Sequence, residues 1–213
     1  MAKKSTRPAS VQRILGEPRG RLLAELCGRP QTAVELAERV GTSSNAVRVH
    51  LDGLRSAGLV DYEVKRQQVG KPTHVYSLTT SAENLLSSAY IPTLQTLLDA
   101  LRARLDGGFV TLLRDVGALL CTRRFAGSEA ARGLDSALSV FESLGTPAVV
   151  ETKGKQRVLS SRCCPLAAIT RETPEVCQLM EQLLTSASGI AMREQCDRGE
   201  HPRCAFAAKS FGT

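Results

Sequence analysis

The hydrophobic pattern of the first sixty residues predicts three short helices. Apolar residues recur at helical spacing over residues 18–27. A second helix is predicted over residues 33–40, because Thr32 can cap it and Glu35 can complete a capping box with Thr32. The third helix is predicted from Ser44, its expected cap, to residue 57.

A strand-like pattern follows these helices. Residues 59–66 alternate apolar and polar side chains, residues 67–72 have the composition of a turn, and residues 73–78 have the pattern of a returning strand. Three helices followed by a hairpin are the element order of a winged helix-turn-helix. The sequence therefore predicts this fold over residues 11–80, preceded by a basic tail over residues 1–10.

The rest of the chain predicts one long helix and then a small α+β domain. The helix covers residues 81–106, with a break expected at Pro92 and a domain junction at Gly107-Gly108. Its apolar seam has steps of three or four residues: Ile91, Leu94, Leu98, Leu101 and Leu105. In the domain at residues 107–213, helices are expected at 109–123, 128–144 and 173–188, and strands at 146–151, 156–161, 190–195 and 204–209. The predicted fold class is α+β.

Charge differs between the two parts of the chain. The net charge is +7; residues 1–80 hold 13 Lys and Arg against 7 Asp and Glu, whereas residues 81–213 hold 15 against 14. A basic N-terminal module suits a polyanionic partner, although chance can produce a difference of this size. No apolar run approaches the ~18 residues of a membrane span, and no apolar stretch follows the basic start. We therefore expect a cytoplasmic protein that does not bind membranes and whose thiols stay reduced.

Polar residues on the third helix and the hairpin are candidates for DNA contact. The third helix buries a stripe of Val47, Leu51 and Leu54, and its other face carries residues suited to base edges, since Asn and Arg can make bidentate contacts with adenine and guanine. The hairpin carries basic residues placed to reach phosphates or the minor groove. Each of these could instead be a solvated surface side chain. The predicted DNA-binding residues are Ser44, Asn45, Arg48, Lys65, Arg66, Gln67 and Lys71.

Two motifs of this module resemble the ArsR-type bacterial regulators. The first is Thr32-Ala33-Val34-Glu35-Leu36-Ala37, continued by Ser44-Asn45-Ala46-Val47-Arg48-Val49-His50-Leu51 and Gly58-Leu59-Val60. The second is the hairpin Gly70-Lys71-Pro72-Thr73-His74-Val75-Tyr76-Ser77-Leu78-Thr79. The resemblance implies a homodimer on double-stranded, pseudopalindromic operator DNA, with residues 81–105 as the dimer element. An intrachain core helix is the alternative interpretation of that stretch.

Five of the seven cysteines fall in the last 51 residues: Cys163, Cys164, Cys177, Cys196 and Cys204. From Cys164 onward the intervals are 12, 18 and 7 residues, so the close pairs of zinc ribbons and thioredoxin-like motifs are absent. Thiolates from four separate segments can instead enclose an iron–sulfur cluster. Cys164 is preferred to Cys163, because Pro165 can begin a helix whose amides favour negative sulfurs. Buried structural cysteines are the alternative, and it is preferred for Cys27 and Cys121.

This region also resembles the sensor domain of the SufR family, repressors of iron–sulfur assembly operons. The likeness rests on Cys164-Pro165-Leu166 and Thr173-Pro174-Glu175-Val176-Cys177, with the twelve-residue interval of that family. The segment from Cys196 to Phe206 resembles the Cys…Gly…Cys-x-Phe close of vinyl-reductase-like sensor domains. The later intervals depart from the SufR pattern. Cys196 is therefore the least secure ligand, with Cys163 or His201 as substitutes.

Together these patterns predict a homodimeric transcriptional regulator, a repressor by resemblance. Its predicted cofactor is a 4Fe–4S cluster, in preference to 2Fe–2S, on Cys164, Cys177, Cys196 and Cys204. The rival hypotheses are zinc or thiol-redox sensing and small-molecule sensing by the same winged-helix architecture. We expect no enzymatic activity, because no nucleophile–base pair or carboxylate dyad stands out.

Overall fold

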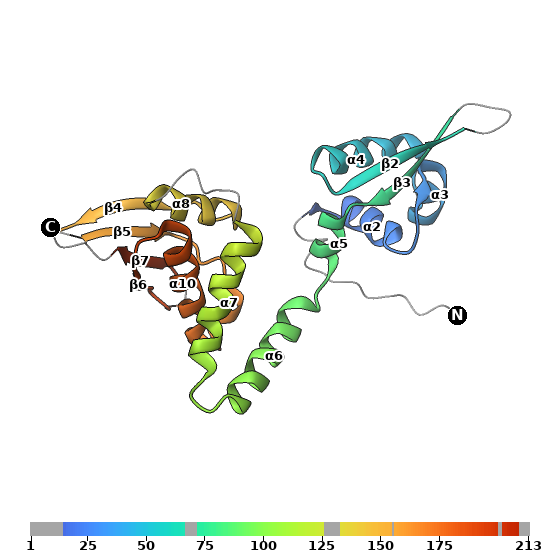
Figure 1. The fold of residues 1–213 in the computed structure, drawn as a ribbon. Helices are drawn as coiled ribbons and strands as arrows, with labels where there is room; N and C mark the ends of the chain where they lie inside the picture. Colours follow the sequence, from blue (N-terminus) through green and yellow to red (C-terminus); the bar gives the residue numbers. More distant parts are fainter. Residues whose placement is uncertain (1–14, 67–71, 126–132, 155, 200–201, 209–213) are drawn as a thin grey trace. The chain divides into compact units, whose positions relative to one another are not determined.

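The computed structural model describes residues 15–66, 72–125, 133–154, 156–199 and 202–208 (Figure 1). The chain divides into two compact units, Met1–Tyr90 and Ile91–Thr213. Both combine helices with an antiparallel sheet, so the fold class is α+β, as predicted. The division falls at the start of helix α6 (Tyr90–Arg104), whereas the sequence analysis placed the junction at Gly107-Gly108.

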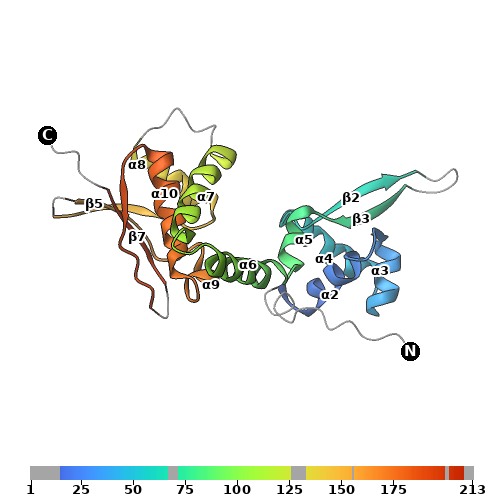
Figure 2. The ribbon, with the colours of Figure 1, turned by 60° about the horizontal axis from the view of Figure 1, so that its bottom comes forward.

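The first unit is a winged helix-turn-helix. Its elements are α2 (Glu17–Leu26), β1 (Gln31–Thr32), α3 (Ala33–Val40), α4 (Ser44–Ser56), β2 (Val60–Lys65), β3 (Thr73–Leu78) and α5 (Thr80–Leu86). The sheet has the order β1-β3-β2, and Figure 2 shows the β2–β3 hairpin extending past the helices of this unit. Leucines of α2 and α3 pack with Val47, Leu51 and Leu54 of α4, which form the predicted buried stripe.

The N-terminal caps of α3 and α4 are of the predicted kinds, but the cap of α4 is one residue earlier than predicted. The capping box of α3 is present: the Glu35 amide donates to the Thr32 hydroxyl at 3.2 Å, and the Thr32 amide donates to the Glu35 carboxylate at 2.7 Å. Helix α4, however, is capped by Ser43, whose hydroxyl accepts from the Ala46 amide at 3.2 Å. The predicted cap, Ser44, is wrong by one position because two adjacent serines offer the same hydroxyl.

The long helix predicted from residue 81 is two helices. Residues 87–89 separate α5 from α6, so the break predicted at Pro92 is wrong. Pro92 lies in the first turn of α6, where a proline costs no intrahelical hydrogen bond. Among the described residues, no helix is both long enough and apolar enough to cross a membrane.

The second unit packs helices on a four-stranded antiparallel sheet of order β4-β5-β7-β6. The strands are β4 (Val149–Lys153), β5 (Gln156–Ser161), β6 (Met192–Glu194) and β7 (Cys204–Ala208). The helices are α6, α7 (Phe109–Arg124), α8 (Leu134–Ser143), α9 (Ala167–Thr170), the 3-10 turn η1 (Pro174–Val176) and α10 (Cys177–Ser188). Side chains of α8 and α10 bury Leu159 and Phe206 of the sheet, which is the core of this unit.

The two halves of the apolar seam predicted along α6 differ in burial. Leu98 is buried and packs with Phe109 and Leu113 of α7, and Leu101 and Leu105 are partly buried beside it. Ile91 and Leu94 are exposed, at 43% and 39%. The carboxyl half of the seam is therefore intrachain core, and only the amino half is available to another molecule.

Candidate functional site

Helix α4 presents the predicted base-reading side chains on its surface. Asn45 and Arg48 are both exposed, and the Arg48 guanidinium donates to the Asn45 side-chain oxygen at 3.1 Å. Ser44 is half-buried at the first position of the helix. The two exposed residues lie one turn apart, so they form one polar surface that does not interrupt the buried stripe.

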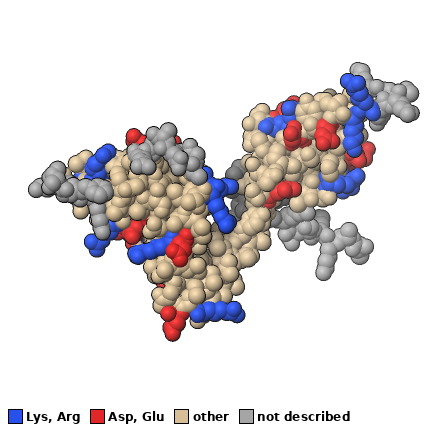
Figure 3. All heavy atoms as spheres, in the orientation of Figure 1, with Lys and Arg blue, Asp and Glu red and all other residues tan. Residues whose placement is uncertain are grey.

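The hairpin is attached to α4 by aromatic contacts. Tyr62 of β2 stacks on His74 of β3 with ring centroids 4.2 Å apart, and the Arg55 guanidinium lies 4.3 Å from the centre of the Tyr62 ring. Lys65 ends β2, and both it and Arg66 are exposed. Figure 3 shows Lys and Arg side chains gathered at this end of the hairpin. The predicted contacts Gln67 and Lys71 lie outside the described residues.

The structure brings together the four cysteines that the sequence analysis grouped. Cys164 follows the end of β5, Cys196 follows the end of β6, and Cys204 opens β7. Because these strands are antiparallel and β7 lies between the other two, all three positions meet at one edge of the sheet. Cys177, the first residue of α10, completes the group. The thiols influence one another electrostatically, Cys196 with Cys177 and Cys204, and Cys204 with Cys164.

Burial and mutual contact divide these four thiols into two kinds. Cys177 and Cys204 are only 4% and 3% exposed, and their pKa values are raised, first by thiol hydrogen bonds to Cys196 and Cys164 respectively and then by burial. The pKa of Cys196 is lowered to about 3, mainly by hydrogen bonds from Cys177 and then Cys204, and that of Cys164 to about 7, mainly by Cys204. Cys196 and Cys164 are therefore the more acidic thiols of the group, and binding of a metal would require the other thiols to lose their protons as well.

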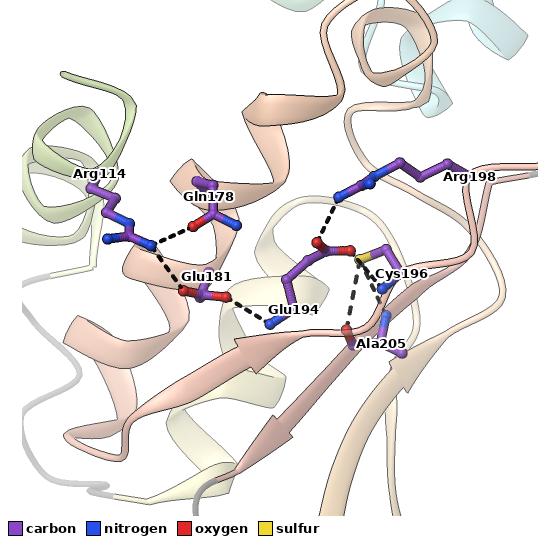
Figure 4. Close-up of polar contacts among 7 residues, drawn as sticks. All are labelled: Arg114, Gln178, Glu181, Glu194, Cys196, Arg198 and Ala205. Atoms are coloured by element: carbon purple, nitrogen blue, oxygen red, sulfur yellow. Dashed lines mark hydrogen bonds and ion pairs between the residues drawn. The ribbon is translucent and has the colours of Figure 1, made fainter. Parts of the chain in front are cut away.

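Two charged residues, Glu194 and Arg198, lie beside Cys196 at the end of β6 (Figure 4). The Glu194 carboxylate accepts from the Cys196 amide at 2.7 Å and from the Arg198 guanidinium at 2.6 Å. The side chain of Arg198 also hydrogen bonds to Cys177. The ligand atoms of Cys177, Glu194 and Cys196 lie within 4.8 Å of one another. Burial is the first cause of a raised pKa at Glu194.

Hydrogen bonds and an ion pair also connect this edge of the sheet to two helices. The Glu194 amide donates to the Glu181 carboxylate of α10 at 2.7 Å, and Arg114 of α7 donates to Gln178 of α10 at 2.6 Å. Arg114 and Glu181 form an ion pair at 3.7 Å (Figure 4). A continuous set of polar contacts therefore joins Glu194, beside Cys196, to α10 and α7.

The sequence analysis missed Glu194 and Arg198 as neighbours of the thiols. Both fall in a segment that it assigned only to a strand and a turn, and a Glu–Arg pair four residues apart is common on protein surfaces. Their position becomes clear only in the folded chain, where β6 pairs with β7 and Glu194 and Cys196 lie close to Cys177. A strand end that carries both a cysteine and a carboxylate was the one local signal available.

The other cysteines and the substitute ligands lie elsewhere. Cys163 is exposed, while its neighbour Cys164 is half-buried and packs against the core. Cys27 was predicted to be a buried structural cysteine, but it is exposed at the end of α2, so that prediction is wrong. Cys121 is partly buried. His201 lies outside the described residues.

The segment between Cys164 and Cys177 was predicted to begin with a helix at Pro165. Instead α9 begins at Ala167, after a turn in which the Ala167 amide donates to the Cys164 carbonyl at 3.1 Å. Further along, the Thr173 hydroxyl is buried and, in the described part of the chain, has no hydrogen-bond partner. An unpaired buried hydroxyl costs about 1–3 kcal/mol.

Comparison with known proteins identifies the first unit. A family model described as a helix-turn-helix domain matches residues 18–63. No curated protein matches the chain. A solved structure assigned as a transcriptional regulator from Thermoplasma acidophilum is 22% identical, with 43% of this chain and 96% of that chain covered and a TM-score of 0.32. An apo double mutant of ZitR from Lactococcus lactis is 20% identical, with 44% and 70% covered and a TM-score of 0.31. The family match therefore shows that the chain carries a helix-turn-helix domain, a motif that binds DNA by placing its second helix in the major groove.

Proposed function

We propose that the chain is a homodimeric transcriptional repressor whose affinity for operator DNA is set by an iron–sulfur cluster in the second unit. Asn45 and Arg48 on α4 would contact base edges, and the basic residues of the hairpin would contact phosphates. Cys164, Cys177, Cys196 and Cys204 would hold the cluster. The observation that carries this proposal is that four separate segments bring their cysteines to one edge of the sheet.

The residues at this edge fit a cluster. Thiolates are the usual ligands of iron–sulfur clusters, and hydrogen bonds to the sulfurs tune their reduction potential. The Ala205 amide donates to the Cys196 sulfur at 3.5 Å, and Arg198 supplies a positive charge beside Cys177. When bound, the cluster would supply a group that oxygen or oxidants can damage. Around it, the chain's own amides and Arg198 would offset the negative charge of the four thiolates.

A single zinc ion is the second candidate occupant. The close approach of Cys177, Glu194 and Cys196, with ligand atoms within 4.8 Å of one another, suits one tetrahedral ion. Anaerobic purification followed by metal and acid-labile sulfide analysis separates the two. A brown protein containing iron and sulfide supports the cluster, whereas a colourless protein containing zinc contradicts it.

The exposed amino half of α6 is the proposed dimer surface. Ile91, Leu94 and Leu97 are 43%, 39% and 52% exposed and lie three residues apart, so they share one side of the helix. A second copy of α6 would cover them, as in a coiled-coil seam.

The Leu97→Glu variant should therefore be monomeric, because a carboxylate cannot be buried in an apolar seam without a partner. Sedimentation equilibrium of the full chain gives the mass directly. Leu119→Glu, on an equally exposed leucine of α7 (53%), is the matched control and should stay dimeric. A dimeric Leu97→Glu variant would place the interface elsewhere.

The segment between Cys164 and Cys177 would connect the cysteine site to this dimer helix. Gln95 of α6 donates to the Ala168 carbonyl at 3.2 Å, and Arg102 of α6 pairs with Glu175 at 2.8 Å. Leu98 packs with Ile169 and Val176 from the same segment. Cys164 and Cys177, two of the four proposed ligands, stand at the two ends of this segment. Loss of the cluster would therefore loosen the contacts between the segment and α6. This change would alter the spacing of the two DNA-binding units in a dimer.

Glu175→Gln should weaken this coupling without removing the metal. The Arg102–Glu175 pair is half-exposed, so losing its charge should reduce the ratio of DNA affinities between loaded and apo protein by up to about fivefold. Fluorescence anisotropy with an operator fragment measures this ratio. Glu172→Gln, an exposed residue of the same segment, should leave it unchanged. An unaltered ratio in Glu175→Gln would exclude this contact from the coupling.

A further inference from the structure

Helix α4 carries one large apolar side chain that the protein core does not use. Val49 is 71% exposed. Among the described residues, no other large apolar side chain is more exposed. Val47, two positions earlier, is fully buried. Two residues turn the direction of a helical side chain by about 200°, so Val49 points away from the core.

The neighbours of Val49 on this surface are polar. Asn45 lies one turn before it, Arg48 precedes it directly, and Asp52 follows three positions later; all three are exposed. Arg48 and Asn45 are also joined by their hydrogen bond of 3.1 Å. Valine is a poorer helix former than alanine, and packing gives no reason for it here. Val49 is thus an apolar side chain on the face of α4 that would contact base edges in the major groove.

Only one base edge in the major groove offers an apolar group, the 5-methyl of thymine. Val49 has two methyl groups and no hydrogen-bonding atom, so it can favour that edge and no polar one. We propose that Val49 is a specificity-determining residue that contacts a thymine methyl in each half-site of the DNA. This inference rests on the proposed DNA binding and assigns a base preference to one residue of α4.

The test compares thymine with deoxyuridine, which lacks only the 5-methyl group. Double-stranded DNA is first selected from a random library with the full-length wild-type protein, and each thymine of the selected sequence is then replaced singly by deoxyuridine. At one thymine per half-site, this replacement should weaken binding of the wild type about fourfold, the equivalent of one buried methyl group. The Val49→Ala variant should show no difference between the two bases at that position.

Val34→Ala is the matched control, because Val34 is a 52% exposed valine on the neighbouring helix α3. It should keep the fourfold response. If Val49→Ala also keeps it, or if no thymine gives a response in the wild type, Val49 is an ordinary surface residue and the inference fails while DNA binding stands. If the library yields no preferred sequence, the inference and the proposed function both fail. Alanine at this exposed helical position preserves folding, which circular dichroism verifies.

Discussion

If the proposed iron–sulfur cluster is bound by the four cysteines, replacing Cys177 and Cys204 together by serine should abolish its retention. These are the two buried thiols of the group, and they connect α10 and β7 to the half-buried Cys196. A serine hydroxyl is a far weaker ligand than a thiolate for iron or zinc. Because losing even an outer-sphere partner costs about 10–100-fold in metal affinity, losing two ligands should cost at least 100-fold. Iron per chain after anaerobic gel filtration should fall to background, and DNA affinity should match that of the apo wild type.

Cys27→Ser and Cys163→Ser are the controls for this experiment. Both cysteines are exposed, and neither takes part in the thiol contacts among the other four. Each variant should retain the iron content of the wild type. Full retention by the Cys177/Cys204 double variant would exclude these residues as ligands. If Cys163→Ser loses iron while Cys164→Ser retains it, the ligand is Cys163 and not Cys164.

The second large effect is expected at Gly117, where α7 crosses α10 without room for a side chain. A Cβ on this buried glycine would overlap the Leu179 carbonyl oxygen and would also lie 3.1 Å from the Leu183 amide nitrogen. Both are backbone atoms of α10, so the helices themselves must separate. Gly117→Ala should therefore destabilise the second unit by about 3 kcal/mol, despite the better helix propensity of alanine. In differential scanning calorimetry this corresponds to a drop in Tm of roughly 10 °C.

Gly53→Ala is the corresponding control in α4. A Cβ there would meet the guanidinium of Arg19 at 3.3 Å, the mobile end of a long side chain that can shift. Its stability should be unchanged or slightly increased, by up to about 1 kcal/mol. Equal stabilities of Gly117→Ala and wild type would mean that α7 and α10 do not cross as closely as described.

The first unit could be predicted from its sequence because its signals are local. The Thr32–Glu35 capping box, the stripe on α4 and the hairpin each depend on residues within one or two turns or strands. What the sequence analysis missed there was small. Strand β1 has two residues, Gln31 and Thr32, which is too short to show a period and exists only because β3 pairs with it.

The second unit shows where local patterns reach their limit. Their number and intervals singled out four cysteines that lie near one another in the structure, but the order β4-β5-β7-β6 that brings them together is a long-range property of the chain. For the same reason Glu194 and Arg198 were not recognised. Along α6, the heptad-like seam was visible in the sequence, but the pattern alone could not distinguish Leu98, which faces α7, from Leu94, which is exposed.

The comparison of loaded and apo protein on one DNA fragment tests the proposed function most directly. Full-length protein purified anaerobically, and the same sample after removal of its metal with a chelator, are titrated against an operator fragment selected by the loaded protein. We predict that the loaded form binds at least about tenfold more tightly, a coupling of about 1.4 kcal/mol, and that the Cys177/Cys204 double serine variant loses this difference. Equal affinities of the loaded and apo wild type would contradict control of DNA binding by the cysteine site.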